Sequence, residues 1–194
     1  ELGDMYYSHW NVEQEPSGLV NRTGSVTTID QWAAQVRTAI QQAATVDISG
    51  GCRYDSIARQ VTIDVRVTGH QDVSGRLQVW ITESDITALQ AMPDGTNNAV
   101  YTHHHVLRCA VNGEWGETFT VSEAESRNFT YSYTPDPGWN PHKLSAVIFV
   151  YNDDGVQQVI EAAIDSYSPS SSQSFSQIRC LVNEVGQSTE NHHF

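Results

Sequence analysis

Basic residues are the clearest deficiency of this sequence. Its 194 residues include 23 Asp and Glu but only 10 Lys and Arg, which gives a formal net charge of -13, and Lys143 is the only lysine. A protein that binds nucleic acid needs cationic side chains to displace the counterions of the phosphate backbone. The same deficiency disfavours binding to an anionic lipid surface. We therefore expect neither nucleic acid nor a bare membrane surface as a partner.

Long apolar runs and common catalytic motifs are also missing. No segment approaches the roughly 18 consecutive apolar residues that would span a bilayer. The patterns G-x-S-x-G, G-x-G-x-x-G and the phosphate-binding P-loop are all absent. The chain begins at Glu1 without the regions of a signal peptide, so we expect a mature or truncated form. These absences predict a protein without enzymatic activity, cofactor or transmembrane segment.

Cysteine is scarce, and its three positions form no C-x-x-C pair. Cys52, Cys109 and Cys180 lie far apart, so at most one disulfide can form and one thiol is left over. Two interpretations stay open: a disulfide between Cys109 and Cys180, or cysteines that act as small buried hydrophobic residues.

One segment has the pattern of an amphipathic helix. Apolar residues recur every three or four positions over residues 27–44, and alanine and glutamine fill most of the remainder. Thr28 and Gln31 match a capping box at the start of this segment. Residues 1–26, in contrast, are aromatic but show no regular period, so we expect them to be irregular.

After Asp47 the period changes to two, as in strands with one buried face. Apolar residues alternate with polar ones over 61–67 and again over 77–81, and we expect these two runs to pair as a hairpin. We expect a short helical turn at 84–90 and a loop at 92–98. The turn at 152–155, Asn-Asp-Asp-Gly, predicts a tight hairpin. Further strands are predicted over 100–111, 118–121, 129–133, 144–151 and 156–163.

These elements indicate a mainly β fold. About eight strands after one helix predict an antiparallel β-sandwich, immunoglobulin-like or of jelly-roll type, with a closed barrel as the alternative. We expect the sandwich to occupy residues 47–164, after an N-terminal region at 1–46. Residues 165–194 are rich in serine and have the composition of a linker and tail.

Three consecutive histidines, His103 to His105, are the most conspicuous polar cluster. If they lie on one strand, His103 and His105 point to the same face and their imidazoles could bind one cation. A metal site needs three or four ligands, and the candidates for the third are His142, His70 or a carboxylate such as Glu114. The alternative is a histidine pair that only forms hydrogen bonds on a sheet face.

Aromatic residues near loops are candidates for contacts with a ligand or partner. Aromatic rings of this kind can stack on sugars or anchor a protein partner, or they can cap the ends of a sandwich. The aromatic residues in question are Trp115, Trp139 and Tyr133, with Tyr6 and Trp10 near the N-terminus.

Three short motifs, in a fixed order, resemble a known family. They are VWITESDI at 79–86, YTHHHVLR at 101–108 and NGEWG at 112–116. Together they resemble the C-terminal β-sandwich region of the Bacteroidetes family of twenty-eight-kilodalton outer-membrane proteins, over most of residues 12–163. In that family a thioredoxin-like region precedes the sandwich, and residues 16–22 are similar to the segment around its cis-proline. The resemblance implies that residues 1–46 are the remnant of such a region, and that the protein is an exported lipoprotein or outer-membrane surface protein.

Two functions follow as expectations. The first is a non-catalytic surface module with a binding, adhesin or scaffold role, whose partner is a protein or glycan and which assembles through its terminal segments. The second is an accessory domain of a thioredoxin-like thiol-disulfide oxidoreductase. A metal- or glycan-binding domain built on the histidine cluster is a weaker third.

Overall fold

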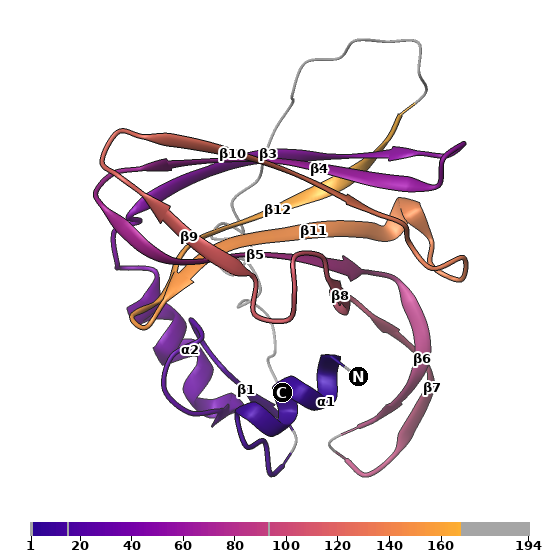
Figure 1. Ribbon diagram of the computed structural model, residues 1–194. Helices are drawn as coiled ribbons and strands as arrows, with labels where there is room; N and C mark the ends of the chain where they lie inside the picture. The colour runs from indigo at the N-terminus through magenta and orange to yellow at the C-terminus, as the bar shows by residue number, and fades with distance from the viewer. Residues whose placement is uncertain (1, 15, 93, 168–194) are drawn as a thin grey trace, which may run out of the picture.

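A computed structural model describes residues 2–14, 16–92 and 94–167. Its centre is a folded sheet of two layers (Figure 1). The upper layer contains three strands: β10 (Ser126–Tyr133), β4 (Gln60–Gly69) and β3 (Val46–Asp55). The lower layer contains five: β12 (Gly155–Tyr167), β11 (Leu144–Asn152), β5 (Val73–Glu83), β8 (Val106–Ala110) and β9 (Glu117–Val121). The end of β12 pairs in parallel with β3, from Ile164 to Tyr167, and this pairing joins the layers. The predicted β-sandwich is therefore confirmed.

The core lies between the two layers and is aliphatic. Alternate residues of β4 and β5 point into it and are fully or almost fully buried: Val61, Ile63, Val65 and Val67 from β4, and Leu77, Val79 and Ile81 from β5. Burial of each such side chain contributes about 1.5–3 kcal/mol to folding. The faces predicted from the alternation are thus the buried ones.

The predicted hairpin between these two runs is wrong. β4 pairs with β3 and β10, whereas β5 pairs with β11, β8 and β9. The short connection after Gly69 carries the chain from the upper to the lower layer, where backbone hydrogen bonds join Gly69 to Ala124 and Glu125. Both apolar faces are therefore buried by facing each other across the core.

The predicted turn at 152–155 is confirmed. β11 and β12 pair antiparallel with Asn152 opposite Gly155. Gly155 has φ 108°, a conformation that residues with a Cβ rarely adopt. The strands predicted over 118–121, 129–133, 144–151 and 156–163 are also present, each with slightly longer bounds.

The segment between β5 and β8 differs from the prediction. Residues expected to form a helical turn and a loop instead contain β6 (Ile86–Ala91) and the start of β7 (Asn97–His103). These strands pair with each other as a two-stranded ribbon that curves down at the right of Figure 1. The single strand predicted over 100–111 is divided into β7 and β8 by a turn at His104 and His105.

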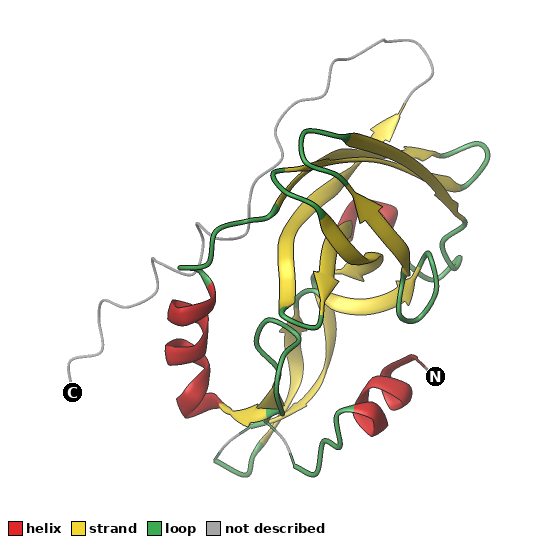
Figure 2. Cartoon of the chain, turned by 60° about the vertical axis from the view of Figure 1, so that its left-hand side comes forward, coloured by secondary structure: helices red, strands yellow, loops and turns green. Residues whose placement is uncertain are grey.

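The N-terminal region contains two helices where one was predicted. α1 (Leu2–His9) lies in the part expected to be irregular, and α2 (Ile29–Ala39) is shorter than the predicted 27–44. Strands β1 (Ser17–Gly18) and β2 (Thr27–Thr28) pair between them. Thr28 is the N-cap of α2, but its hydroxyl bonds the Asp30 carboxylate and the predicted capping box does not form. Both α-helices lie on the side of the lower layer that faces away from β10, β4 and β3 (Figure 1), and Figure 2 shows them in red, apart from each other at the lower left and lower right of the molecule.

The strands of the sandwich run from Val46 to Tyr167, close to the predicted 47–164. The final strand therefore includes residues 165–167, which were expected to begin the linker. The rest of the predicted tail, residues 168–194, lies outside the described residues. None of the helices in the described part of the chain is long and apolar enough to cross a membrane.

Candidate functional site

The guanidinium of Arg22 lies inside a group of aromatic rings. Its Cζ is 4.3 Å from the centroid of the Tyr151 ring and 5.0 Å from that of Trp10. Ring faces attract a cation, and burial lowers the pKa of this guanidinium. We call this group the Arg22 cluster; its members are Arg22, Tyr6, Trp10, Trp80, Trp115, Phe149 and Tyr151, with every ring centroid within 6.0 Å of Cζ.

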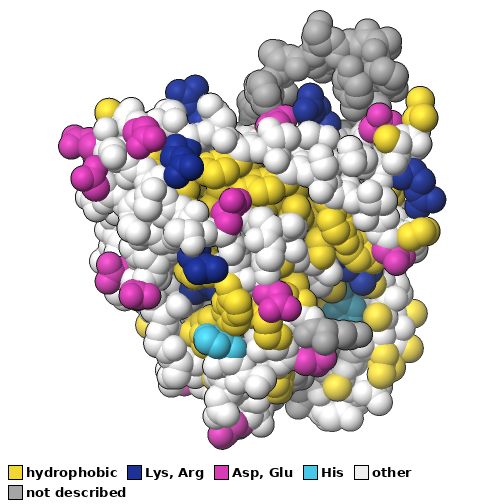
Figure 3. Space-filling view, in the orientation of Figure 1, with side chains coloured by type: hydrophobic (Ala, Val, Ile, Leu, Met, Phe, Trp, Pro, Cys, Tyr) yellow, Lys and Arg dark blue, Asp and Glu magenta, His cyan; other side chains and the backbone are white. Residues whose placement is uncertain are grey.

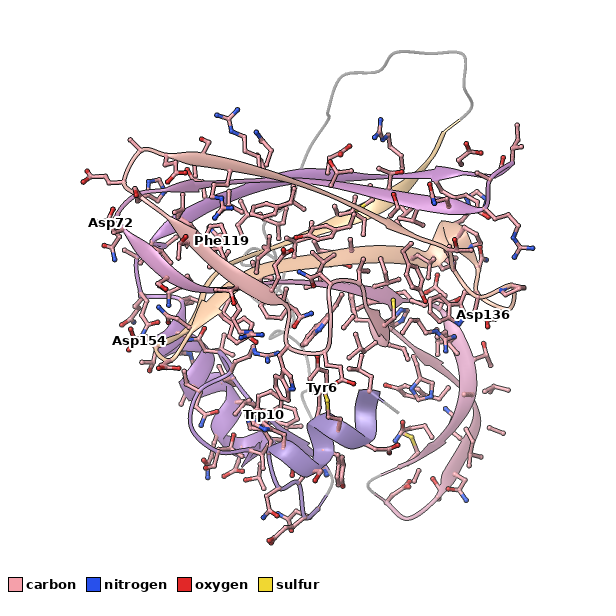
Figure 4. The ribbon with its side chains drawn as sticks, in the orientation of Figure 1. Tyr6, Trp10, Asp72, Phe119, Asp136 and Asp154 are labelled. Carbon is pink, nitrogen blue, oxygen red and sulfur yellow. The ribbon has the colours of Figure 1, made fainter. Side chains whose placement is uncertain are left out.

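The Arg22 cluster attaches the N-terminal region to the sandwich. The Tyr6 hydroxyl accepts a hydrogen bond from Trp80 Nε1 at 3.2 Å and donates one to the backbone oxygen of Glu114. The Trp115 backbone oxygen accepts from the Tyr151 hydroxyl at 2.7 Å. Tyr6 and Trp10 lie beneath the lower layer in Figure 4. Three of the five aromatic residues predicted to bind a partner, namely Tyr6, Trp10 and Trp115, therefore meet in one place, where they pack on the chain itself.

The other two predicted aromatic residues meet elsewhere, at the end of β10 and in the loop after it, which contains the Asp136 that Figure 4 labels. The ring of Trp139 stacks on Tyr133, with centroids 6.0 Å apart, and the Arg108 guanidinium lies 5.5 Å from the Trp139 ring. Tyr133 also hydrogen-bonds to Cys109. Burial raises the pKa of the Cys109 thiol, and burial together with the Cys109 contact raises the pKa of Tyr133 to about 12. A thiol with a raised pKa forms little thiolate, which suits a structural role for Cys109.

A buried ion pair adjoins this second aromatic group. The Glu83 side chain is 7% exposed, and its Oε2 accepts from Arg108 Nε at 2.8 Å and Nη2 at 2.7 Å. Its Oε1 accepts from the backbone N–H of Asn140 at 2.9 Å. Glu83 therefore holds the 134–143 connection against β5 and β8. The predicted disulfide partner of Cys109, Cys180, lies outside the described residues.

The histidine segment does not have the geometry assumed for a metal site. β7 ends at His103, and His105 has φ 53° in the following turn, so the two do not share one strand face. His104 Nδ1 lies 3.2 Å from Asp85 Oδ1, and His105 Nε2 lies 3.5 Å from Glu161 Oε1. Among the residues that the structure describes, no group of three or more His, Cys, Asp or Glu side chains could hold a metal ion. The predicted pair thus has no third ligand there; instead, the turn joins the base of the β6–β7 ribbon to the sandwich.

The ribbon itself carries exposed apolar side chains. Leu89 is 64% exposed and Val100 is 74% exposed. Thr87 lies opposite Thr102 in the register, so the alternation along each strand puts Leu89 and Val100 on the same face. Figure 3 shows hydrophobic side chains, and no basic ones, over the lower right of the molecule where the ribbon lies. The structure thus leaves an apolar surface here that is not packed against the sandwich.

The sequence reasoning missed this ribbon. The available signal was Asp94-Gly95, which favours a hairpin turn, between two stretches rich in threonine and apolar residues. In the structure Gly95 has φ 81°, and the Asp94 carboxylate accepts from both the backbone and the hydroxyl of Thr96.

One comparison with a solved structure agrees with this architecture. HBP35 of Porphyromonas gingivalis has a similar fold, with a TM-score of 0.69 at 11% identity over 91% of this chain and 61% of that one. A domain of the outer membrane lipoprotein Omp28 from Porphyromonas gingivalis is 24% identical, with a TM-score of 0.47 over 66% of this chain and 93% of that one. No curated protein matches the sequence. A family model described as outer membrane protein Omp28 matches residues 3–168, and the chain therefore belongs to the Omp28 family.

Proposed function

We propose that this chain is a non-catalytic protein-binding module, and that the β6–β7 ribbon is its binding surface. The family is one of outer-membrane proteins, so the location of the chain is the outer-membrane surface or the exterior. One observation carries the proposal: Leu89 and Val100 are both largely exposed on one face of a ribbon that stands apart from the core. Exposed apolar side chains that share a face are typical of surfaces that bind another protein.

The two aromatic groups are less suitable as binding surfaces, because their rings already contact other groups of the same chain. The rings of the Arg22 cluster surround a cation that belongs to the chain, and the Trp139 ring contacts both Tyr133 and Arg108. A glycan needs ring faces that are open to solvent. A protein partner is therefore better supported than a glycan. Assembly through the terminal segments stays a prediction, since Tyr6 and Trp10 pack on the sandwich and residues 168–194 lie outside the described part.

Site-specific photo-crosslinking in the native bacterium tests the proposal. A photoreactive amino acid replaces Leu89 in one variant and Ile57 in the control. Ile57 is 84% exposed in the turn between β3 and β4, so it samples the solvent without a neighbouring apolar face. We expect a discrete adduct from position 89 and none of the same mass from position 57. No adduct at 89, or the same adducts at both positions, would contradict the proposal.

The alternative of an accessory domain in a thiol-disulfide oxidoreductase also stays a prediction. It requires a C-x-x-C motif in a region before residue 1, together with a thioredoxin-like origin of residues 1–46. The encoding gene and the intact mass of the natural protein test both requirements. A gene without an upstream C-x-x-C would eliminate this alternative.

A further inference from the structure

We infer that the β6–β7 ribbon is a hinged arm, which can straighten into a continuation of the β5–β8 strand pair. Its role in binding rests on the proposed function, because the hinge sets the direction of the face that carries Leu89 and Val100. Three features support the hinge: the register of the strands, two left-handed residues, and the polar contacts that hold the bend.

The ribbon and the β5–β8 pair are two parts of one ladder in the same register. The last pair of the sandwich part is Glu83 opposite Val106. The first pair of the ribbon is Ile86 opposite His103. Two residues on each strand therefore separate the two parts. Because this gap has the same length on both strands, the ladder could run through it without any slip in register.

One residue in each strand of the gap has a left-handed backbone. φ is 59° at Asp85 and 53° at His105, values that a residue with a Cβ adopts at a cost in free energy. The hairpin bends at these positions, and beyond them the ribbon curves down at the right of Figure 1. A hinge needs a few residues that absorb a large change in φ and ψ. A change to extended backbone at these two residues would straighten the hairpin.

The two sides of the gap differ in how firmly they are held. On the sandwich side, the Glu83 side chain is 7% exposed and lies 2.7 Å from Arg108 Nη2. On the ribbon side, β6 and β7 pair only with each other among the described residues. A fixed pair of strands is thus followed directly by a pair that no other described strand holds.

Polar contacts at the surface hold the bent form. The Asp85 carboxylate accepts a hydrogen bond from Lys143 Nζ and lies 3.2 Å from His104 Nδ1. The hydrogen bond from Lys143 lowers the pKa of Asp85, so this carboxylate is charged at neutral pH. The His105 N–H donates to Ser84 Oγ at 3.0 Å. In the bent form, a side chain therefore satisfies a backbone group that a continuous ladder would pair.

These contacts are weak enough to be exchanged for backbone pairing. The side chains of Asp85 and Lys143 are 41% and 45% exposed, so solvent screens their charges. An exposed ion pair of this kind changes an equilibrium by about two- to fivefold. In the straight form, one of the two newly aligned residue pairs would exchange backbone hydrogen bonds, and both left-handed residues would lose their strain. The two forms therefore lie close in free energy, and the ion pair favours the bent one.

Residual dipolar couplings of the isotope-labelled full chain test the hinge, because they report the orientation of the ribbon relative to the sandwich. A double variant, Asp85→Val with His105→Val, places β-branched residues at both left-handed positions, where such residues are strongly disfavoured. Its couplings should fit the straight form, whereas those of the wild type should fit the bent form. Lys143→Met should raise the ratio of straight to bent form by about two- to fivefold.

Arg53→Met is the matched control for Lys143→Met. It also breaks an exposed ion pair, with Asp64, but between β3 and β4 of the upper layer. Its ribbon couplings should equal those of the wild type. Couplings within the sandwich should stay unchanged in every variant, which verifies the fold. If the double variant does not fold, His105→Val alone must change the ribbon couplings in the same direction.

The outcomes separate the hinge from the proposed function. A double variant that keeps the bent arrangement overturns the inference, and so do equal ribbon couplings in Lys143→Met and Arg53→Met. If the hinge fails while position 89 still gives a cellular adduct, the ribbon is a rigid arm and the proposed function stands. If the hinge is present but position 89 gives no adduct, only the proposed function fails.

Discussion

The buried carboxylate of Glu83 gives a sharp test of how one end of the sandwich is held together. Arg108→Met removes both side-chain donors to Glu83 and leaves its charge with one N–H, that of Asn140. Removing one partner of a buried ion pair costs about 3–5 kcal/mol. The same change removes the contact between the guanidinium and the Trp139 ring, which contributes about 0.5–1 kcal/mol. Because Arg108 itself reaches solvent in part, we expect a total near the lower limit, about 3 kcal/mol.

An exposed ion pair of similar length supplies the matched control. Arg53 Nη2 lies 2.8 Å from Asp64 Oδ2, but the Arg53 side chain is 57% exposed. Solvent screens this pair, so Arg53→Met should cost less than about 1 kcal/mol. The two Arg→Met variants therefore differ in burial more than in the geometry of the pair that they break.

A double variant separates the buried charge from the lost contacts. Glu83→Gln keeps an acceptor for Asn140 and removes the charge, so adding it to Arg108→Met should recover about 1–2 kcal/mol. Urea unfolding followed by tryptophan fluorescence measures each free energy, with the slope m as a check that unfolding stays two-state. If Arg108→Met and Arg53→Met cost the same, or if the double variant is merely additive, the reasoning about burial is refuted.

Three further predictions concern single positions. Tyr6→Phe removes two hydrogen bonds of the Arg22 cluster and should lower the free energy of unfolding by about 1–2 kcal/mol; no change in urea unfolding would mean that the hydroxyl is dispensable. Gly155→Ala places a Cβ 2.4 Å from Asn21 Nδ2 at φ 108°, whereas the Cβ of Gly95→Ala, at φ 81°, meets nothing within 4 Å. Gly95→Ala should therefore cost only the backbone strain, about 1–2 kcal/mol, and Gly155→Ala should cost more. Equal thermal midpoints of the two variants would contradict this. Burial raises the pKa of Tyr133 to about 12, so the contribution of the neutral phenol to stability is fully present below the ordinary tyrosine pKa of about 10 and is lost as the pH rises through 12. Tyr133→Phe should therefore remove the tyrosinate absorbance step near pH 12. A step that remains in this variant would belong to another tyrosine.

The alternation of apolar residues predicted the buried faces correctly because each sandwich strand has one side in the core. Val61 to Val67 and Leu77 to Ile81 show this period without interruption. The period identifies the buried face of a strand, however, and says nothing about its neighbour in the sheet. Two successive strands can bury their faces by pairing side by side or by facing each other across the core. The second arrangement occurs here, so the predicted hairpin was wrong although both faces were right.

The ribbon was missed for the opposite reason. Neither of its faces is buried against the sandwich, so apolar and polar residues need not alternate along it. Residues 86–103 therefore lack the period that identifies a strand with one buried face. The Arg22 cluster was hidden in another way, because its rings come from α1, the turn after it, β5, β11 and the loop before β9. No local pattern in a sequence reports that residues so far apart meet around one guanidinium. The strand assumed to continue through His105 ends at His103, so the two histidines do not share one face of it.

Stability and recognition lie in different parts of this molecule, which has a measurable consequence. The large aromatic side chains and the buried ion pair join the N-terminal region and the loops to the sandwich, so changes there should lower the free energy of unfolding. Leu89 and Val100 are largely exposed, so replacing either by Glu should change that free energy by no more than about 0.5 kcal/mol. The same replacements should weaken binding of the partner protein, while Tyr6→Phe should leave that binding unchanged at temperatures where the variant is folded. A ribbon variant that is destabilised as much as an Arg22-cluster variant would show that the ribbon stabilises the folded core, which would contradict this separation of stability from recognition.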